Sequence, residues 1–253
     1  MPQKDFLFLH LRDLPYFRAF LRAVESTYYQ DLPLPAPVYD AGCGDGHFAS
    51  LTFDHKIDVG LDPWHGPIHA AKKYGAYRFL VEADGRQTPF PSEYFASGFS
   101  NSVLEHIPHI DAVLIETARV LKRGAPFYFC VPNSRYLSEL SLSRALGKSY
   151  TEWFRKISRV SHADEPVVWQ ARLERAGFEL VRWWHYFSPA AMRVLEWGHY
   201  FGLPALIARL ITGRWIIIRT WWNLWLTERF VRQYASPKPL ENGTFTFYIA
   251  RKT

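Results

Sequence analysis

A glycine-rich turn constrains this chain more than any other feature of its sequence. The turn is Asp40-Ala41-Gly42-Cys43-Gly44-Asp45-Gly46, and it follows a short β-type run that begins at Val38. A helical pattern starts at His47, so the turn joins a strand to a helix. Three glycines within five residues let the backbone approach a ligand closely at the N-terminus of that helix. The segment therefore predicts a binding site for a nucleotide-type ligand.

Short β-type runs alternate with helical or loop segments along most of the chain. The expected strands are Val38–Ala41, Ile57–Leu61, Arg78–Glu82, Ala96–Ser100, Phe127–Val131, Phe178–Trp184 and Thr244–Ala250. The expected helices are 14–29, His47–Phe53, Pro67–Tyr74, Ile110–Leu121 and Ala163–Ala176. This alternation predicts an α/β fold with a doubly wound, mostly parallel sheet.

The composition indicates a globular protein with an excess of aromatic residues. Of the 253 residues, 48% are hydrophobic and 21% charged, and no repeat or linker divides them, so we expect one domain over 1–253. The aromatic share of 17% predicts aromatic surface that faces a ligand, a partner or a membrane. Cys43 and Cys130 have no metal-ligand spacing, and the N-terminus lacks a signal-peptide pattern. We therefore expect a cytoplasmic location, no disulfide and no metal site.

The spacing of the glycines separates two families of nucleotide-type binders. The dinucleotide fingerprint is G-x-G-x-x-G, whereas Gly42, Gly44 and Gly46 follow G-x-G-x-G, which disfavours an NAD-dependent reductase. The segment 38–46 resembles the first motif of the class I S-adenosylmethionine-dependent methyltransferases, specifically their small-molecule and quinone-methylating group. This resemblance implies S-adenosylmethionine as the cofactor. It also implies a Rossmann-like sheet of seven strands, mostly parallel, with an antiparallel last strand.

Three further motifs extend the resemblance to residue 107, and the turn Leu121–Ala125 extends it to about residue 132. They are Val59–Pro63, Val81–Gly85 and Phe99–Ile107, in the family's order. Asp62 ends the second strand about twenty residues after the turn, where a carboxylate can accept hydrogen bonds from both ribose hydroxyls; the alternative is a helix cap or a solvated acid. The resemblance implies that Asp84 accepts from the adenine amino group. The expected cofactor residues are Asp40, Gly42, Cys43, Gly44, Gly46, Asp62, Pro63, Asp84, Gly85, Asn101, Ser102 and Val103.

Methyl transfer from a sulfonium asks the protein mainly to align donor and acceptor and to exclude water. A hydroxyl acceptor would benefit from a general base, for which His106 and His162 are the candidates. The alternative for each histidine is that it only makes a structural hydrogen bond and moves no proton. The segment 101–104 lacks the Asp/Asn-Pro-Pro-aromatic motif of enzymes that methylate base amino groups. Nucleic acid is thus a disfavoured substrate, supported only by the net charge of +6.

An unusual segment, 187–234, precedes the last expected strand. It holds six Arg, two Glu, no Lys, no Asp and five of the ten Trp. Two amphipathic helices are expected within 205–227. One apolar face has Leu206, Ile207, Leu210 and Ile211, and the other has Trp215, Ile217, Ile218, Trp221, Trp222, Leu224 and Trp225. Arginines interrupt both, so neither reaches the length of a membrane span. The segment is interpreted as a helical insertion that forms a cap, a lid, a dimer contact or a membrane-interface element.

Taken together, these patterns predict an S-adenosylmethionine-dependent methyltransferase with a small, hydrophobic or lipid-linked acceptor. O-, N- and C-methylation all remain open, as does the oligomeric state. The alternative is a non-catalytic cofactor-binding module that uses 187–234 to hold a partner or a membrane. The alternative to a purely cytoplasmic location is peripheral contact with the inner face of the membrane through 205–227.

Overall fold

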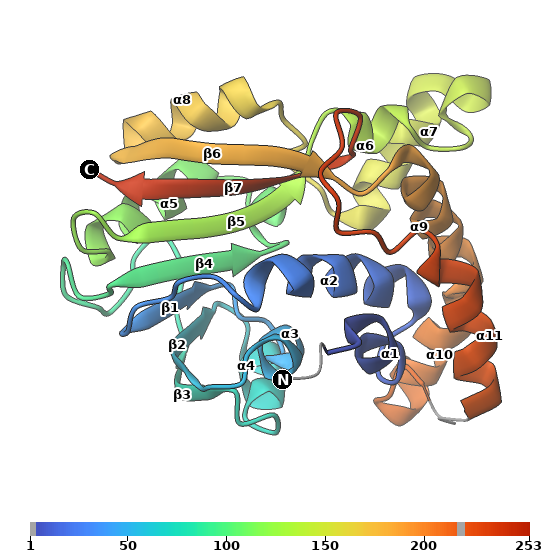
Figure 1. Cartoon of the computed structure of the whole chain (residues 1–253), viewed down its shortest axis with the longest axis horizontal. Coiled ribbons are helices and arrows are strands. Elements are labelled where there is room, and N and C mark those ends of the chain that lie inside the picture. Colours follow the sequence, from blue (N-terminus) through green and yellow to red (C-terminus); the bar gives the residue numbers. More distant parts are fainter. Residues whose placement is uncertain (1–3, 217–220) are drawn as a thin grey trace.

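The computed structural model describes residues 4–216 and 221–253. Seven strands form one sheet in the order β3-β2-β1-β4-β5-β7-β6 (Figure 1). Their bounds are β1 Val38–Ala41, β2 Ile57–Asp62, β3 Tyr77–Glu82, β4 Ser97–Asn101, β5 Pro126–Pro132, β6 Phe178–Tyr186 and β7 Phe245–Lys252. β7 is antiparallel to both of its neighbours, and the other pairings are parallel. The predicted Rossmann-like sheet with an antiparallel last strand is confirmed.

Each face of the sheet has its own hydrophobic core. Side chains alternate along β5, so Phe127 and Phe129 enter one core while Tyr128 and Cys130 enter the other. Helices α5 (Ile110–Val120) and α8 (Pro166–Ala176) contribute to the first core. The second core includes residues of α1 (Phe6–Leu11), α2 (Tyr16–Tyr29), α3 (His47–Thr52) and α4 (His65–Ala71). The result is the three-layer arrangement typical of doubly wound folds.

The carboxyl ends of the parallel strands carry the site-forming loops. The strand order reverses between β1 and β4, and their loops diverge at that switch point, where open α/β sheets bind ligands. Figure 1 shows that β4 and β5 point toward α9 (Pro189–Phe201), α10 (Leu203–Thr212) and α11 (Trp221–Arg232). These three helices lie between β6 and β7 in the chain. The helices of 187–234 therefore gather beyond the strand ends that carry the sequence motifs.

Three short helical elements were not predicted from the sequence. They are α1, α6 (Arg135–Ser138) and the 3₁₀ helix η1 (Leu104–His106). A longer one, α7 (Ser143–Ser158), was also missed, and Gly147 interrupts it with a φ of 62°. The amphipathic pattern continues across this interruption, so the periodicity was present in the sequence and was not recognised.

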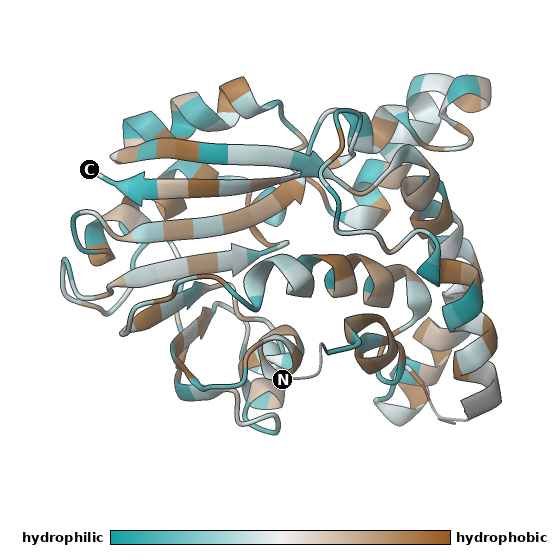
Figure 2. Ribbon diagram, in the orientation of Figure 1, coloured by the Kyte–Doolittle hydropathy of each residue, from teal (hydrophilic) through white to brown (hydrophobic). Residues whose placement is uncertain are grey.

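The structure revises the boundaries expected within 187–234. α10 carries the predicted apolar residues Leu206, Ile207, Leu210 and Ile211, and Gly213 ends it with a φ of 72°. The second helix does not begin at Trp215, because Trp215 and Ile216 are non-helical and α11 starts at Trp221. Ile217 and Ile218 lie outside the described residues. Figure 2 shows hydrophobic and hydrophilic segments mixed along these helices, and none of the described helices is long and apolar enough to cross a membrane.

Candidate functional site

The glycine turn has backbone angles that only glycine adopts easily. Gly42, Gly44 and Gly46 have φ values of 89°, 54° and 73°. A Cβ on Gly42 would lie 2.4 Å from Val103 Cγ1, so this position has no room for a side chain. A Cβ on Gly44 would meet no atom within 4 Å. The turn thus packs tightly against the β4 loop at Gly42 and leaves open space beside Gly44.

Asp62 links the end of β2 to this turn. Its Oδ2 accepts a hydrogen bond from the Gly44 nitrogen at 3.1 Å, and its Oδ1 accepts one from the Trp64 nitrogen at 3.0 Å. The residue is only 7% exposed, and burial raises the pKa of its carboxyl. A carboxylate offers about four acceptor positions, so two remain after these backbone contacts. Asp62 can therefore accept two further hydrogen bonds from a ligand.

A cavity of about 1410 Å³ runs along the carboxyl ends of β1, β2 and β4. Every expected cofactor residue except Gly46 lines it: Asp40, Gly42, Cys43, Gly44, Asp62, Pro63, Asp84, Gly85, Asn101, Ser102 and Val103. Gly46 begins α3 instead, and a Cβ there would lie 3.1 Å from Ala71 Cβ. His106 lines the cavity, whereas His162 does not.

Two aspartates of this wall differ strongly in their electrostatics. Asp40 is buried and accepts a hydrogen bond from the Tyr77 hydroxyl at 2.7 Å; burial raises the pKa of Asp40 to about 7. Asp84 is exposed and forms a two-pronged ion pair with Arg86, whose Nε and Nη2 lie 3.0 and 2.6 Å from the carboxylate oxygens. These hydrogen bonds lower the pKa of Asp84 to about 2. Asp84 therefore stays an anionic acceptor at the open edge of the cavity.

Asn101 and Ser102, at the end of β4, are held by a buried glutamate of α2. Asn101 Nδ2 donates to Glu25 Oε2, and the Ser102 hydroxyl donates to Glu25 Oε1, both at 2.8 Å. The Tyr186 hydroxyl also donates to Glu25 Oε1, at 2.9 Å. Burial raises the pKa of Glu25, while these hydrogen bonds and the charge of Arg22 oppose that shift. Asn101 Oδ1 is buried without a partner among the described residues, and so remains available to a ligand.

Glu105 and His106 follow on η1 and line the same cavity. Glu105 is 3% exposed, its Oε2 has no partner in the described chain, and burial raises its pKa to about 7. His106 Nδ1 lies 2.9 Å from the Arg159 carbonyl oxygen. Because a carbonyl only accepts, Nδ1 carries the proton and a neutral His106 keeps its lone pair on Nε2. That nitrogen lies 3.8 Å from Glu105 Oε1.

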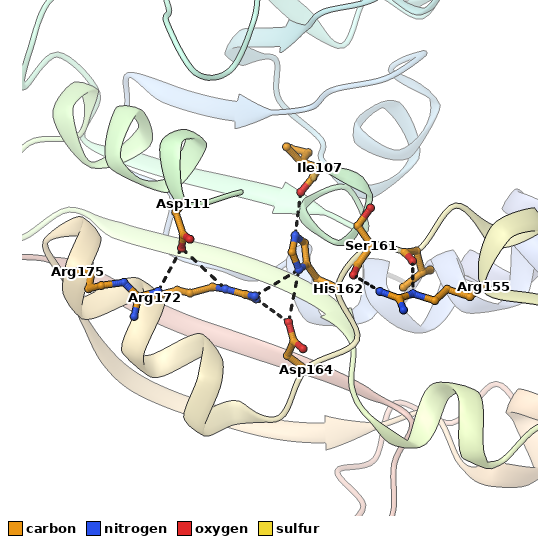
Figure 3. A network of polar contacts seen from close by, with 9 residues as sticks. Ile107, Asp111, Arg155, Ser161, His162, Asp164, Arg172 and Arg175 are labelled. Atoms are coloured by element: carbon orange, nitrogen blue, oxygen red, sulfur yellow. Dashed lines mark hydrogen bonds and ion pairs between the residues drawn. The ribbon is translucent and has the colours of Figure 1, made fainter. Parts of the chain in front are cut away.

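His162 belongs to a separate polar network (Figure 3). Its Nε2 lies 3.0 Å from the Ile107 carbonyl oxygen, to which it donates, and its Nδ1 accepts from Arg172 Nη2 at 3.3 Å. Arg172 in turn forms an ion pair with Asp164 at 2.6 Å. Both ring nitrogens are thus engaged with the protein. This network joins the β4 loop to α8, outside the walls of the cavity.

Several cavity residues were missed in the sequence. The opposite wall comes from Arg18 and Arg22 of α2, Leu195 and His199 of α9, and Arg209 of α10. Glu25 of α2 also lines the cavity and bonds to Asn101 and Ser102. Leu206, Leu210 and Trp215, which were expected on the apolar faces of a cap or lid, line the wall as well. The three α2 residues are spaced four and three apart, which places them on one face of the helix. That spacing was the available signal, but it was masked by the stronger apolar face of the same helix.

The central part of the chain is similar to known methyltransferases. Residues 39–129 match the family model described as a methyltransferase domain. The chain is 35% identical over 102 residues to a sterol methyltransferase-like protein of Botryococcus braunii, with 37% of this chain and 26% of that protein covered. It is 33% identical over 121 residues to a ubiquinone/menaquinone biosynthesis C-methyltransferase of Brucella canis, with 40% and 43% covered. The chain thus spans less than half the length of these two relatives.

Solved structures extend the likeness of fold to nearly the whole chain. A structure of a S-adenosylmethionine-dependent methyltransferase from Thermotoga maritima has a TM-score of 0.59 at 17% identity, with 94% of this chain and 91% of that chain covered. Within the described ranges 4–216 and 221–253, no three His, Cys, Asp or Glu residues are grouped as metal ligands. Residues 39–129 thus match a methyltransferase domain, and the strand order and the motif residues along one cavity agree with the resemblance to the class I S-adenosylmethionine-dependent methyltransferases.

Proposed function

We propose that this chain transfers a methyl group from S-adenosylmethionine to a small, hydrophobic or lipid-linked acceptor. The observation that carries the proposal is a single cavity with the motif residues on one wall and apolar residues of α2, α9 and α10 on the other. Its volume of about 1410 Å³ exceeds the roughly 300–1,000 Å³ of a site for one small molecule. Donor and acceptor can therefore lie side by side in one enclosure, as methyl transfer requires.

The residues of the strand-end wall fit the cofactor. Asp62 has two free acceptor positions for the ribose hydroxyls, and Gly44 leaves space for the ligand next to them. Asp84 and Gly85 lie at the open edge, where they would hold the adenine ring. Asn101 Oδ1, a buried acceptor with no partner among the described residues, suits the amino group of the methionine portion. Arg22 lies across the cavity and would pair with the carboxylate of that portion.

The cofactor supplies an activated methyl group when bound, so this chain's task is alignment, exclusion of water and removal of a proton where the acceptor carries one. We propose His106 as the residue that accepts this proton on Nε2, because its Nδ1 is occupied by the Arg159 carbonyl. His162 is proposed as a structural residue, since both of its ring nitrogens are already bonded.

The segment 187–234 is proposed as a cap on a single domain. α9 contacts α2, and Leu195, Leu206, Leu210 and Trp215 line the cavity from above the strand ends. This apolar wall supports a hydrophobic acceptor, and the relatives named for sterol and ubiquinone/menaquinone methylation support the same class.

Calorimetric titration with S-adenosylhomocysteine tests the cofactor site. The wild-type protein should bind, and Asp62→Asn should weaken binding by about tenfold or more, because the amide no longer accepts at both oxygens. Glu82→Gln is the matched control: Glu82 pairs with Asp62 in the β2–β3 register but does not line the cavity. Absence of binding to the wild-type protein, or an equal loss in both variants, contradicts the proposal.

Acceptor turnover is then measured by mass spectrometry of lipid and metabolite extracts incubated with S-adenosylmethionine. A product heavier by one methyl group in the extractable apolar fraction is the expected result. Methylation confined to water-soluble compounds without an apolar portion contradicts the hydrophobic acceptor.

A peripheral membrane contact is a second candidate role for the cap. Leu210 and Ile211 on α10 are each 78% exposed, and Arg209 and Arg214 lie beside them. Apolar side chains flanked by arginine suit the interface of an anionic membrane. The double variant Leu210→Ser/Ile211→Ser should lose flotation with phosphatidylglycerol vesicles, while Val167→Ser/Val168→Ser on α8, also exposed, should keep it. Unchanged flotation of the α10 variant contradicts the membrane contact.

A further inference from the structure

The cavity wall formed by α2 and α10 carries a group of arginines. Arg18 and Arg22 lie one turn apart on α2, and Arg209 projects from α10; all three line the cavity. The guanidinium carbons of Arg18 and Arg209 lie 5.4 and 4.8 Å from the centroid of the same ring, that of Trp215. Two segments distant in the sequence, α2 and residues 209–215, therefore converge on one cationic and aromatic site.

Arg18 and Arg22 are half-buried, whereas Arg209 is exposed. Within the described residues, no hydrogen bond or ion pair of the Arg18, Arg22 or Arg209 side chain is found. Burial and the charge of Arg22 lower the pKa of Arg18 to about 10, with Asp45 opposing and Arg209 adding to the shift. Like charges held together at a partly desolvated wall destabilise the protein unless an anion compensates them.

The acidic side chains of the cavity lie near the motif residues. Glu25, Asp40, Asp62 and Glu105 belong to, or contact, the strand ends and the loops that carry the methyltransferase motifs. Acidic groups suit the positive sulfonium of the donor, and guanidinium groups suit an anionic ligand. The acidic groups gather at the motif residues, where Asp45 also acts on Arg18, while Arg209 and Trp215 lie on α10 and in the loop after it.

The wall formed by α2 and α10 is also apolar between its arginines. Phe17 and Leu21 on α2, with Leu206 and Leu210 on α10, line the cavity around Arg18, Arg209 and Trp215. Guanidinium groups bind phosphate and carboxylate through paired hydrogen bonds, and stacking on an aromatic ring orients them for this contact. An anionic group joined to a hydrocarbon chain or ring matches both parts of this surface.

We propose that Arg18 and Arg209, held against Trp215, bind an anionic group of the methyl acceptor, which is therefore an anionic amphiphile bearing a phosphate or a carboxylate. The inference rests on the proposed function, because it names the acceptor class for the same cavity. Arg18 and Arg209 are specificity-determining residues of this site. Arg22, whose charge acts on Asp40, Asp45, Glu25 and Glu105, is assigned to the donor half.

Calorimetry with dodecyl phosphate as the probe, below its micellar concentration and on protein saturated with S-adenosylhomocysteine, tests the proposal. Dodecyl phosphate should bind about tenfold or more tightly than dodecanol, because only the phosphate engages the guanidinium groups. Arg18→Gln and Arg209→Gln should each weaken dodecyl phosphate binding by about tenfold and leave S-adenosylhomocysteine binding within about twofold. Arg18→Lys keeps the charge and should retain part of the affinity.

Arg229→Gln is the matched control, because Arg229 also stacks on a tryptophan, 5.6 Å from the centroid of Trp225, but does not line the cavity. It should leave both affinities unchanged. Circular dichroism and the retained binding of S-adenosylhomocysteine establish that the variants are folded. Equal binding of dodecanol and dodecyl phosphate, or an equal loss in Arg229→Gln, overturns the proposal.

Two further outcomes would show that the arginines bind an anion other than that of the methyl acceptor. If Arg18→Gln weakens the binding of S-adenosylhomocysteine rather than that of dodecyl phosphate, the guanidinium holds the cofactor's own carboxylate. The acceptor proposal is then wrong. If the variant loses flotation with phosphatidylglycerol vesicles in parallel with dodecyl phosphate binding, the site holds a membrane headgroup, and the proposal is again wrong. A wild-type protein that binds dodecyl phosphate but no S-adenosylhomocysteine instead contradicts the proposed function while the anion site stands.

Discussion

The carboxylate of Asp62 accepts a hydrogen bond from the backbone nitrogen of Gly44 at 3.1 Å. This contact ties the end of β2 to the glycine turn after β1, so two sequence motifs eighteen residues apart act as one surface. The open space beside Gly44 and the free acceptor positions of Asp62 lie next to each other. Substitutions in the turn should therefore separate its structural role from its binding role.

Gly42→Ala and Gly44→Ala should differ in their effects. An alanine at 42 would place Cβ 2.4 Å from Val103 Cγ1 in a left-handed backbone, and should lower the free energy of unfolding by roughly 2 to 4 kcal/mol. An alanine at 44 meets no protein atom and should cost only about 1 kcal/mol, but should weaken S-adenosylhomocysteine binding. Urea unfolding and calorimetry measure the two effects; the reverse order contradicts this assignment.

Removal of Glu25 should destabilise the protein strongly. Glu25→Ala leaves the buried donors of Asn101, Ser102 and Tyr186 without their acceptor and should lower the free energy of unfolding by about 3 to 5 kcal/mol. Urea unfolding measures the loss. Glu179→Ala, at an exposed position of β6, is the control and should change stability by less than about 0.5 kcal/mol. A loss of similar size in both variants would show that the hydrogen bonds of Glu25 do not stabilise the protein.

Glu105 should make stability depend on pH. Its folded pKa of about 7 lies above the usual 4.5, so the folded protein retains a proton that the unfolded chain releases. Stability should therefore fall as pH rises from about 4.5 to about 7, by roughly 3 kcal/mol, and stay level above that range. Glu105→Gln removes this contribution. Asp40, which also has a raised pKa, is present in both proteins and cancels in the difference.

The measurement is the difference in the free energy of urea unfolding between Glu105→Gln and wild type at pH 5 and at pH 8. The free energy of unfolding of the variant, relative to that of the wild type, should be larger at pH 8 than at pH 5. A difference that does not change between the two pH values contradicts the raised pKa of Glu105.

The two histidines should respond differently to substitution. His162→Ala removes contacts to Ile107 and Arg172 and should lower the free energy of unfolding by about 1 to 3 kcal/mol, with S-adenosylhomocysteine binding retained. His106→Ala removes a partly exposed ring and should preserve stability better while lowering the rate of methylation of a hydroxyl acceptor. Thermal unfolding and methyl-incorporation assays compare them. Full activity of His106→Ala would exclude it as the proton acceptor.

Sequence patterns were enough to predict the fold and most residues of the strand-end wall of the cavity. Strand-to-helix alternation and the run of motifs from Val38 to Ile107 predicted the sheet and its cavity-lining residues, because those residues are local to the strand ends. Periodicity also located α10, whose apolar face is intact from Leu206 to Ile211.

The wall opposite that surface depends on contacts between distant parts of the chain. Glu25 gains its role from a hydrogen bond to Asn101, a residue 76 positions away, and Arg18 meets Trp215 only because the cap folds back over α2. Such contacts leave no local periodicity, since each residue is compatible by itself with an ordinary helix surface. The same holds for His106 and His162, which were both general-base candidates in the sequence and differ in which of their ring nitrogens the rest of the chain already binds.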